Sequence, residues 1–228
     1  MLQNNPDATI QICDRELHFP ECTVFQQACA LLLKSDALKI KGQQQEAGIC
    51  IRKAVALVRN APPSLATDVA VYPNALFHLG SHLCHVEQNF AEAVTVLTEA
   101  LNIHDDHFKL GALPDRFEAA RLLCCIGESY HGMDAALAET THKDACFWYL
   151  NESIKVYRVA IENNLQFQPA SAEPIFLNAA FAYDYYGERA AALRLIDELE
   201  GMQNPHDAWG KRVLARCADT RAAMIASP

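Results

Sequence analysis

The sequence predicts an all-α protein: an array of four antiparallel helix pairs, followed by a last helix that covers the end of the array. Three observations lead to this fold. Apolar residues recur with the 3.6-residue spacing of amphipathic helices. One spacing pattern returns along the chain, and proline- and glycine-containing segments separate its copies. The chain has no apolar run near the roughly 18 residues that a membrane span needs.

The repeated pattern is a helix, a turn and a second helix, with apolar or small residues at fixed positions. Three copies have the same internal spacing. They are Leu31, Ser35, Leu38, Gly42, Ala47, Ile51 and Ala54; Phe77, Ser81, Cys84, Gln88, Ala93, Leu97 and Ala100; and Phe176, Ala180, Tyr183, Gly187, Ala192, Ile196 and Leu199. Self-similarity at a fixed spacing is the signature of a helical repeat array. The sequence therefore indicates a binding surface more than an enzyme.

The third copy is interrupted. Gly127 stands at the crossing position of its first helix and Ala160 at that of its second helix. Between them, we interpret Gly132–His142 as an insertion that precedes the second helix. The purpose of this insertion is left open by the sequence.

Both ends of the chain lie outside the pairs. We expect residues 1–22 to be an N-terminal extension, in which Ala8–Cys13 alternates weakly and is either simply part of that extension or a short strand. Residues 23–228 are expected to form a single repeat domain. Asp207 follows a chain break and is a good N-cap for the last helix, which should end near Ile225.

Small residues stand where paired helices would cross, because helices approach closely only there. They are Ser35, Ala47, Ala54, Ser81, Ala93, Ala100, Gly127, Ala160, Ala180 and Ala192. This pattern resembles the tetratricopeptide repeat (TPR) family over about residues 24–201. The resemblance implies a superhelix whose first helices line a concave, peptide-binding groove. The family repeat is about 34 residues, whereas the first-helix crossing residues recur here at 46, 46 and 53, so longer helices or linkers are expected.

A second resemblance lies near the C-terminus. Gln168-Pro169, Pro174–Leu177 and Tyr183 are similar to the segment before the penultimate helix of 14-3-3 proteins. This resemblance implies, as an alternative, a divergent helical dimer or phosphopeptide-type binder. Trp148 and Ala182 stand where that family has an arginine and an asparagine, so its phosphate-binding residues are not carried over.

Composition limits the classes of binding partner and the cellular compartment that we expect. The formal net charge is -9, which disfavours nucleic acid because phosphate binding needs a basic stripe. A neutral or cationic peptide is the easier partner. The nine cysteines include no C-x-x-C pair, which is typical of free thiols in a reducing compartment. Residues 1–7 have neither the basic region nor the apolar core of a signal peptide, so we expect a cytoplasmic protein.

The most distinctive polar pattern is three histidines spaced i, i+4 and i+7. This spacing puts His78, His82 and His85 on one helix face, turned about 100° from the core positions. Three interpretations remain open: a pH-sensitive patch that contacts a peptide, a solvated face without a ligand, or a metal site. The metal site lacks a carboxylate on that face, and we expect no metal and no cofactor.

The same face of the other first helices adds charged and aromatic residues. For Phe181, on that face, we expect burial under the last helix. We therefore predict a non-catalytic protein–protein interaction module (an adaptor, co-chaperone or complex subunit) that binds a peptide or helix, with an enzyme built on the helical scaffold as a further alternative. The predicted groove residues are Asp36, Lys39, His78, His82, His85, Arg121, Glu128, His131, Asp184 and Tyr185.

Overall fold

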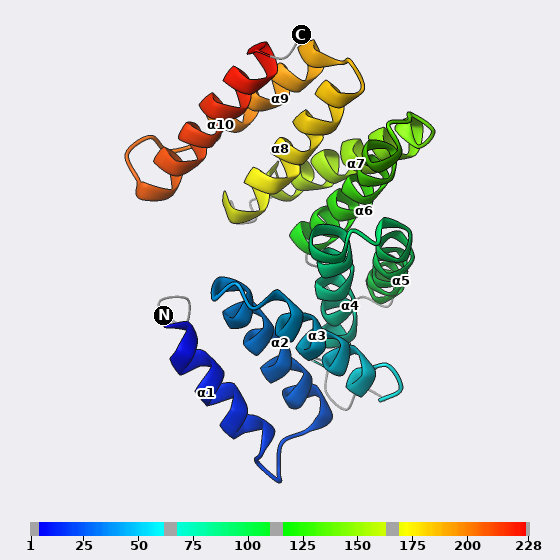
Figure 1. Ribbon diagram of the computed structural model, residues 1–228, viewed down its shortest axis with the longest axis vertical. Coiled ribbons are helices and arrows are strands. Elements are labelled where there is room, and N and C mark those ends of the chain that lie inside the picture. Colours follow the sequence, from blue (N-terminus) through cyan, green and yellow to red (C-terminus); the bar gives the residue numbers. More distant parts are fainter. Residues whose placement is uncertain (1–4, 62–67, 110–115, 163–168, 227–228) are drawn as a thin grey trace. The chain divides into compact units, whose positions relative to one another are not determined.

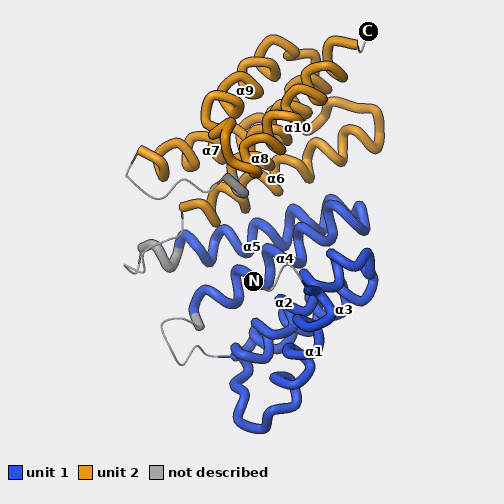
Figure 2. The backbone as a smooth tube through the Cα atoms, turned by 90° about the vertical axis from the view of Figure 1, so that its left-hand side faces the viewer, with its two compact units in different colours: residues 1–113 blue, residues 114–228 orange. Residues whose placement is uncertain are grey.

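The structure is a computed structural model that describes residues 5–61, 68–109, 116–162 and 169–226. These residues form helices and turns without a strand (Figure 1), which confirms the all-α prediction. Among them, no helix has the length and apolar character of a membrane span. The chain divides into two compact units, residues 1–113 and 114–228 (Figure 2). The single domain expected over residues 23–228 stays a prediction.

The first unit contains the first two predicted pairs. Helix α2 packs against α3, α4 packs against α5, and α4 also contacts both α2 and α3. The elements are α1 (Pro6–Leu17), α2 (Val24–Ile40), α3 (Gln44–Val58), the 3₁₀ turn η2 (Asp68–Ala70), α4 (Val71–His82), the π-helical turn η3 (Leu83–Glu87) and α5 (Phe90–Lys109).

Helix α1 excludes the alternative of a short strand at Ala8–Cys13. Asn5 caps it, since its side chain accepts a 3.1 Å hydrogen bond from the Ala8 amide. The helix lies alongside α2 (Figure 1) and buries Cys13. An ion pair of 2.5 Å between Lys34 and Asp14 also joins the two helices. The weak alternation of polar and apolar residues over Ala8–Cys13 therefore does not indicate a strand, because these residues belong to a helix.

The second unit contains the third and fourth pairs and the last helix. Helix α6 packs against α7, α8 packs against α9, and α10 packs against α9 and α8. The last helix is therefore present as predicted, and the Asp207 side chain accepts from the Gly210 amide at 2.6 Å, as expected of its cap. The elements are α6 (Arg116–Leu137), α7 (Lys143–Glu162), α8 (Pro169–Tyr185), α9 (Arg189–Gly201) and α10 (Ala208–Ala226).

The turn inside each pair has one residue in the left-handed region. The φ angles are 76° at Gly42, 54° at Gln88, 53° at Ala138 and 81° at Gly187. A left-handed residue directly after a helix lets the next amide bond back to the last turn. The second pair keeps this geometry without glycine, and the π-turn Leu83–Glu87 precedes it. The left-handed turn conformation is thus kept in all four pairs, although the residue at this position is glycine in only two of them.

The expected insertion is mostly helix. Residues 132–137 continue α6 to Leu137, and the chain then turns at Ala138 and enters α7 at Lys143. The third pair therefore differs from the others by a longer first helix and a longer turn.

The close approach of paired helices explains why small residues stand at the crossing positions. A Cβ atom added to Gly80 of α4 would lie 2.4 Å from Cγ of Leu97 on α5, and one added to Gly127 of α6 would lie 2.7 Å from Cγ of Leu150 on α7. In the second pair Gly80 therefore makes the close approach, while the predicted crossing residue Ser81 is only half-buried. The other predicted crossing residues are buried.

Candidate functional site

The three histidines of the first unit do not form one exposed row. Helix α4 ends at His82, and the π-turn that follows changes the spacing before His85. His82 is 3% exposed, so the expectation that it lies on an accessible face is wrong. A Cβ atom added to Gly48 of α3 would lie 2.5 Å from its Nε2. His82 is thus a packing residue between α3 and α4.

A short chain of polar contacts fixes the His82 ring. Its Nε2 lies 3.1 Å from Oε1 of Glu87, and Arg52 of α3 donates to both Glu87 oxygens at 2.6 and 2.7 Å. Burial lowers the pKa of His82, although the Glu87 carboxylate opposes this effect. Hydrogen bonding to Arg52 holds the pKa of Glu87 below its usual value. Burial therefore favours the neutral form of this imidazole, which lies next to the ion pair between Arg52 and Glu87.

Three other predicted groove residues of the first unit lie close together. Oδ1 of Asp36 on α2 is 3.2 Å from Nζ of Lys39 and 3.6 Å from Nδ1 of His78 on α4. His85 is exposed on the π-turn. The contact between α2 and α4 thus gathers Asp36, Lys39 and His78 at one place, while their role in a groove stays a prediction.

In the second unit, the contact between α6 and α8 brings together two predicted groove residues. The His131 ring meets the Tyr185 ring edge-on, with 5.0 Å between ring centroids. The Tyr185 hydroxyl is 3.0 Å from the carbonyl oxygen of Asp134 and 3.1 Å from that of Glu139, and donates toward both. Burial lowers the pKa of His131. Tyr185 is therefore held in place by the end of α6 and the turn that follows it, while 40% of its surface stays exposed.

Phe181 corrects a second expectation. It lies one turn before Tyr185 on α8 and is 43% exposed, rather than buried under the last helix. Residues four apart share a helix face. Phe181 and Tyr185 thus form an exposed aromatic pair on the helix face that the repeat pattern assigns to the groove.

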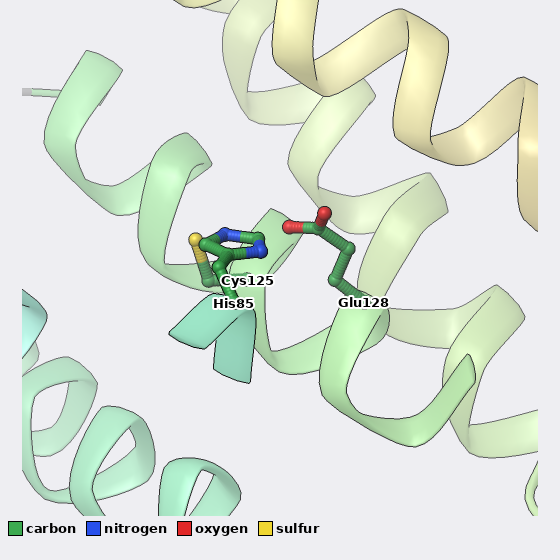
Figure 3. A group of neighbouring side chains, drawn as sticks. All are labelled: His85, Cys125 and Glu128. Atoms are coloured by element: carbon green, nitrogen blue, oxygen red, sulfur yellow. The ribbon is translucent and has the colours of Figure 1, made fainter. Parts of the chain in front are cut away.

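The remaining predicted residues of this unit are engaged within it. Arg121 pairs with Glu118 at 3.3 Å, and Asp184 pairs with Arg189 at 2.8 Å. Glu128 projects from α6, as does Cys125 one turn earlier (Figure 3). Burial raises the pKa of Glu128 to about 8, and a hydrogen bond with an asparagine of α8 only partly offsets it.

Sequence reasoning missed a buried carboxylate in the extended end of α6. Asp134 is 1% exposed, and it accepts 2.9 and 3.1 Å hydrogen bonds from the His142 amide and one of 2.7 Å from the Tyr186 hydroxyl. Nδ1 of His142 is also 2.7 Å away. Burial alone would raise the pKa of Asp134, but these bonds bring it below its usual value. An acidic residue at the end of a helix gives no sequence signal of such burial.

Comparison with known proteins leaves the family open. No family model and no curated protein matches the sequence. Among solved structures, the crystal structure of BtubC (BKLC) from P. vanneervenii is similar, with 12% sequence identity and a TM-score of 0.40. The match covers 98% of this chain and 91% of that one. A likeness at this TM-score is too low to assign a fold or a function.

Proposed function

We propose that this chain is a non-catalytic protein-interaction module of TPR-like architecture, which binds a peptide or helical segment of another protein. The observation that carries the proposal is the exposed pair Phe181 and Tyr185 on α8. Large aromatic side chains left at the surface on one helix face are typical of interaction sites.

The surroundings of Tyr185 favour binding. Its hydroxyl is within hydrogen-bonding distance of the carbonyl oxygens of Asp134, in α6, and Glu139, in the turn after it, and its ring rests against His131. A side chain that is already ordered loses little rotamer entropy when a partner docks. Tyr185 is therefore preorganised, as expected of a residue that contributes much of the binding energy.

The surface charges of this unit support an unphosphorylated partner. A phosphate site needs arginines or lysines that converge on the ligand. Several cations of α6–α9 instead face a carboxylate of the same unit: Arg121, Lys143, Lys155, Arg158 and Arg189. The net charge of -9 favours a neutral or basic segment. We therefore prefer an adaptor, co-chaperone or complex subunit over the 14-3-3-like alternative.

The buried polar groups support a role without catalysis. The Asp134 carboxylate accepts hydrogen bonds from the Tyr186 hydroxyl and the His142 amide, and these bonds connect α6 to the segments after α8 and before α7. Cys146 is fully buried, and burial raises the pKa of its thiol to about 12. A thiol in that state is a poor nucleophile.

The cysteines also support the proposed cytoplasmic location. The structure, which describes all nine, forms no disulfide between them, and seven of them are buried. Buried free cysteines behave as small apolar residues and persist in a reducing compartment.

Peptide display tests the proposed function. Random peptides would be selected against the full chain, and the binders would then be titrated against Phe181→Ala. Ile225→Ala is the matched control, because Ile225 is an exposed apolar residue on α10. We expect the selected peptides to lose about tenfold or more in affinity with Phe181→Ala and to bind Ile225→Ala like wild type. Equal losses with both variants, or a selection without binders, would contradict the proposal.

A further inference from the structure

A second aromatic surface lies on α7, apart from the residues of the proposed groove. Trp148 is 57% exposed. The buried residues of the same helix, Cys146, Leu150 and Ile154, face the core, so the indole is on the outward side. A tryptophan combines the largest apolar surface of any side chain with a strong π face. Here more than half of that surface is exposed and does not contribute to core packing.

The indole is held by a series of aromatic contacts. The Trp148 ring meets the Tyr149 ring at 4.8 Å and 88°, and the Tyr149 ring stacks on Tyr130 of α6 at 5.7 Å. Tyr130 in turn stacks on His142 at 5.6 Å. The contact with Tyr149 restrains the Trp148 ring, while over half of the surface of Trp148 stays accessible. A ligand therefore meets an ordered indole.

Carboxylates flank the indole along the helix. Asp144 precedes Trp148 by four residues and Glu152 follows it by four, so both share its side of α7. Asp144 is exposed, and Glu152 is 3.1 Å from Nζ of Lys155. An incoming arginine would compete with Lys155 for this carboxylate, which it can bind through two parallel hydrogen bonds. A cation on the indole face is attracted by the ring quadrupole and by these carboxylates together.

We propose that Trp148, Asp144 and Glu152 bind an arginine- or lysine-containing segment of a partner protein, with one cationic side chain over the indole. The charge pattern selects this occupant. The same surface on a second copy of the chain would bring like charges together, and nucleic acid would bring phosphates toward carboxylates in a chain of net charge -9. This surface does not depend on the exposed aromatic pair Phe181 and Tyr185 of the proposed function.

The test uses a pair of synthetic peptides that differ only in charge. One is a soluble alanine-rich peptide with arginines four residues apart, and the other has citrulline, which is neutral and similar in shape, at the same positions. Because the chain has two tryptophans, the full chain with Trp209→Phe makes the emission report on Trp148. Calorimetry with the unmodified chain gives the affinity.

We expect the arginine peptide to change Trp148 emission and to bind about tenfold more tightly than the citrulline peptide. Trp148→Ala should lose most of that difference, Trp148→Phe should keep part of it, and Asp144→Asn with Glu152→Gln should lower the affinity. Phe181→Ala should bind like wild type, which separates this surface from the proposed groove. Equal binding of the two peptides, unchanged affinity of Trp148→Ala, or a dimer that Trp148→Ala abolishes would each overturn the proposal.

Discussion

The Tyr186 hydroxyl donates a 2.7 Å hydrogen bond to Oδ2 of Asp134, whose carboxylate is buried. Tyr186 follows the end of α8 and Asp134 lies near the end of α6, so this bond joins the fourth helix pair to the third. His142 reaches the same carboxylate from the turn before α7. The segment that looked like an insertion thus supplies the polar connection that positions Tyr185 and the exposed aromatic pair.

Replacement of the buried carboxylate should destabilise the protein. We expect Asp134→Asn to lower the free energy of unfolding by about 2 kcal/mol, because charge-assisted hydrogen bonds are lost and buried donors lose their acceptor. Urea denaturation at pH 7 measures this change. Asp219→Asn is the matched control, since Asp219 is exposed on α10 and away from its first turn, and it should leave the midpoint nearly unchanged. Equal effects of the two variants would contradict the role of Asp134.

The same comparison has a defined pH dependence. The pKa of Asp134 is lowered in the folded state, so its contribution is fully present above the unfolded pKa of about 3.9 and is lost as the pH falls through the folded pKa. The stability difference between wild type and Asp134→Asn should therefore shrink below about pH 4. A difference that stays constant from pH 7 to pH 3 would contradict this assignment.

The close crossing of α4 and α5 should not tolerate a methyl group. Gly80→Ala should lower the free energy of unfolding by about 1–3 kcal/mol, because the new Cβ overlaps the buried Leu97 side chain. Gly201→Ala is the control, since a Cβ there meets no atom within 4 Å and alanine favours the helix. Thermal denaturation of both variants checks this prediction, and a stable Gly80→Ala variant would mean that the two helices cross elsewhere.

The buried histidine should behave as a structural residue. His82→Glu should destabilise the chain by more than about 2 kcal/mol, because it places a carboxylate beside Glu87 in a buried site. His206→Glu, at an exposed position, is the control. Chemical denaturation compares them, and a fully stable His82→Glu would show that this site is open to solvent.

The pH dependence of stability gives a second test of His82. Because burial lowers its folded-state pKa, the stability from the neutral ring is fully present above the unfolded pKa of about 6.5 and is lost as the pH falls through the folded value. His82→Gln should therefore lose less stability than wild type between pH 7 and pH 5. Parallel curves for the two proteins would exclude this contribution.

The left-handed turns predict opposite effects of two substitutions. Gln88→Gly should stabilise the chain by about 1 kcal/mol, since glycine removes the side-chain penalty at φ 54°. Gly42→Ala should destabilise it by a similar amount, because the equivalent position has φ 76°. Denaturation midpoints measure both changes, and shifts of the same sign would show that the two turns are not equivalent.

The sequence predicted the helix pairs because their cause is local. Small residues, helical periodicity and turn residues such as Gly42 and Gly187 act within one helix pair. The candidate site was harder to predict, because exposure depends on which helices pack together. His82 faces Gly48 of α3, 34 positions earlier, and Phe181 is exposed although its helix is mostly buried. The π-turn after α4, which breaks the histidine row, has no simple sequence signal.

The most direct test of the proposed binding function is site-specific photo-crosslinking at position 181. A benzoyl derivative of phenylalanine would replace Phe181 in one preparation and Ile225 in another, and each would be irradiated in a lysate of the source cells. The account predicts covalent capture of a partner protein at position 181, blocked by a display-selected peptide, and little capture at position 225. Equal capture at both positions, or none at position 181, would contradict it.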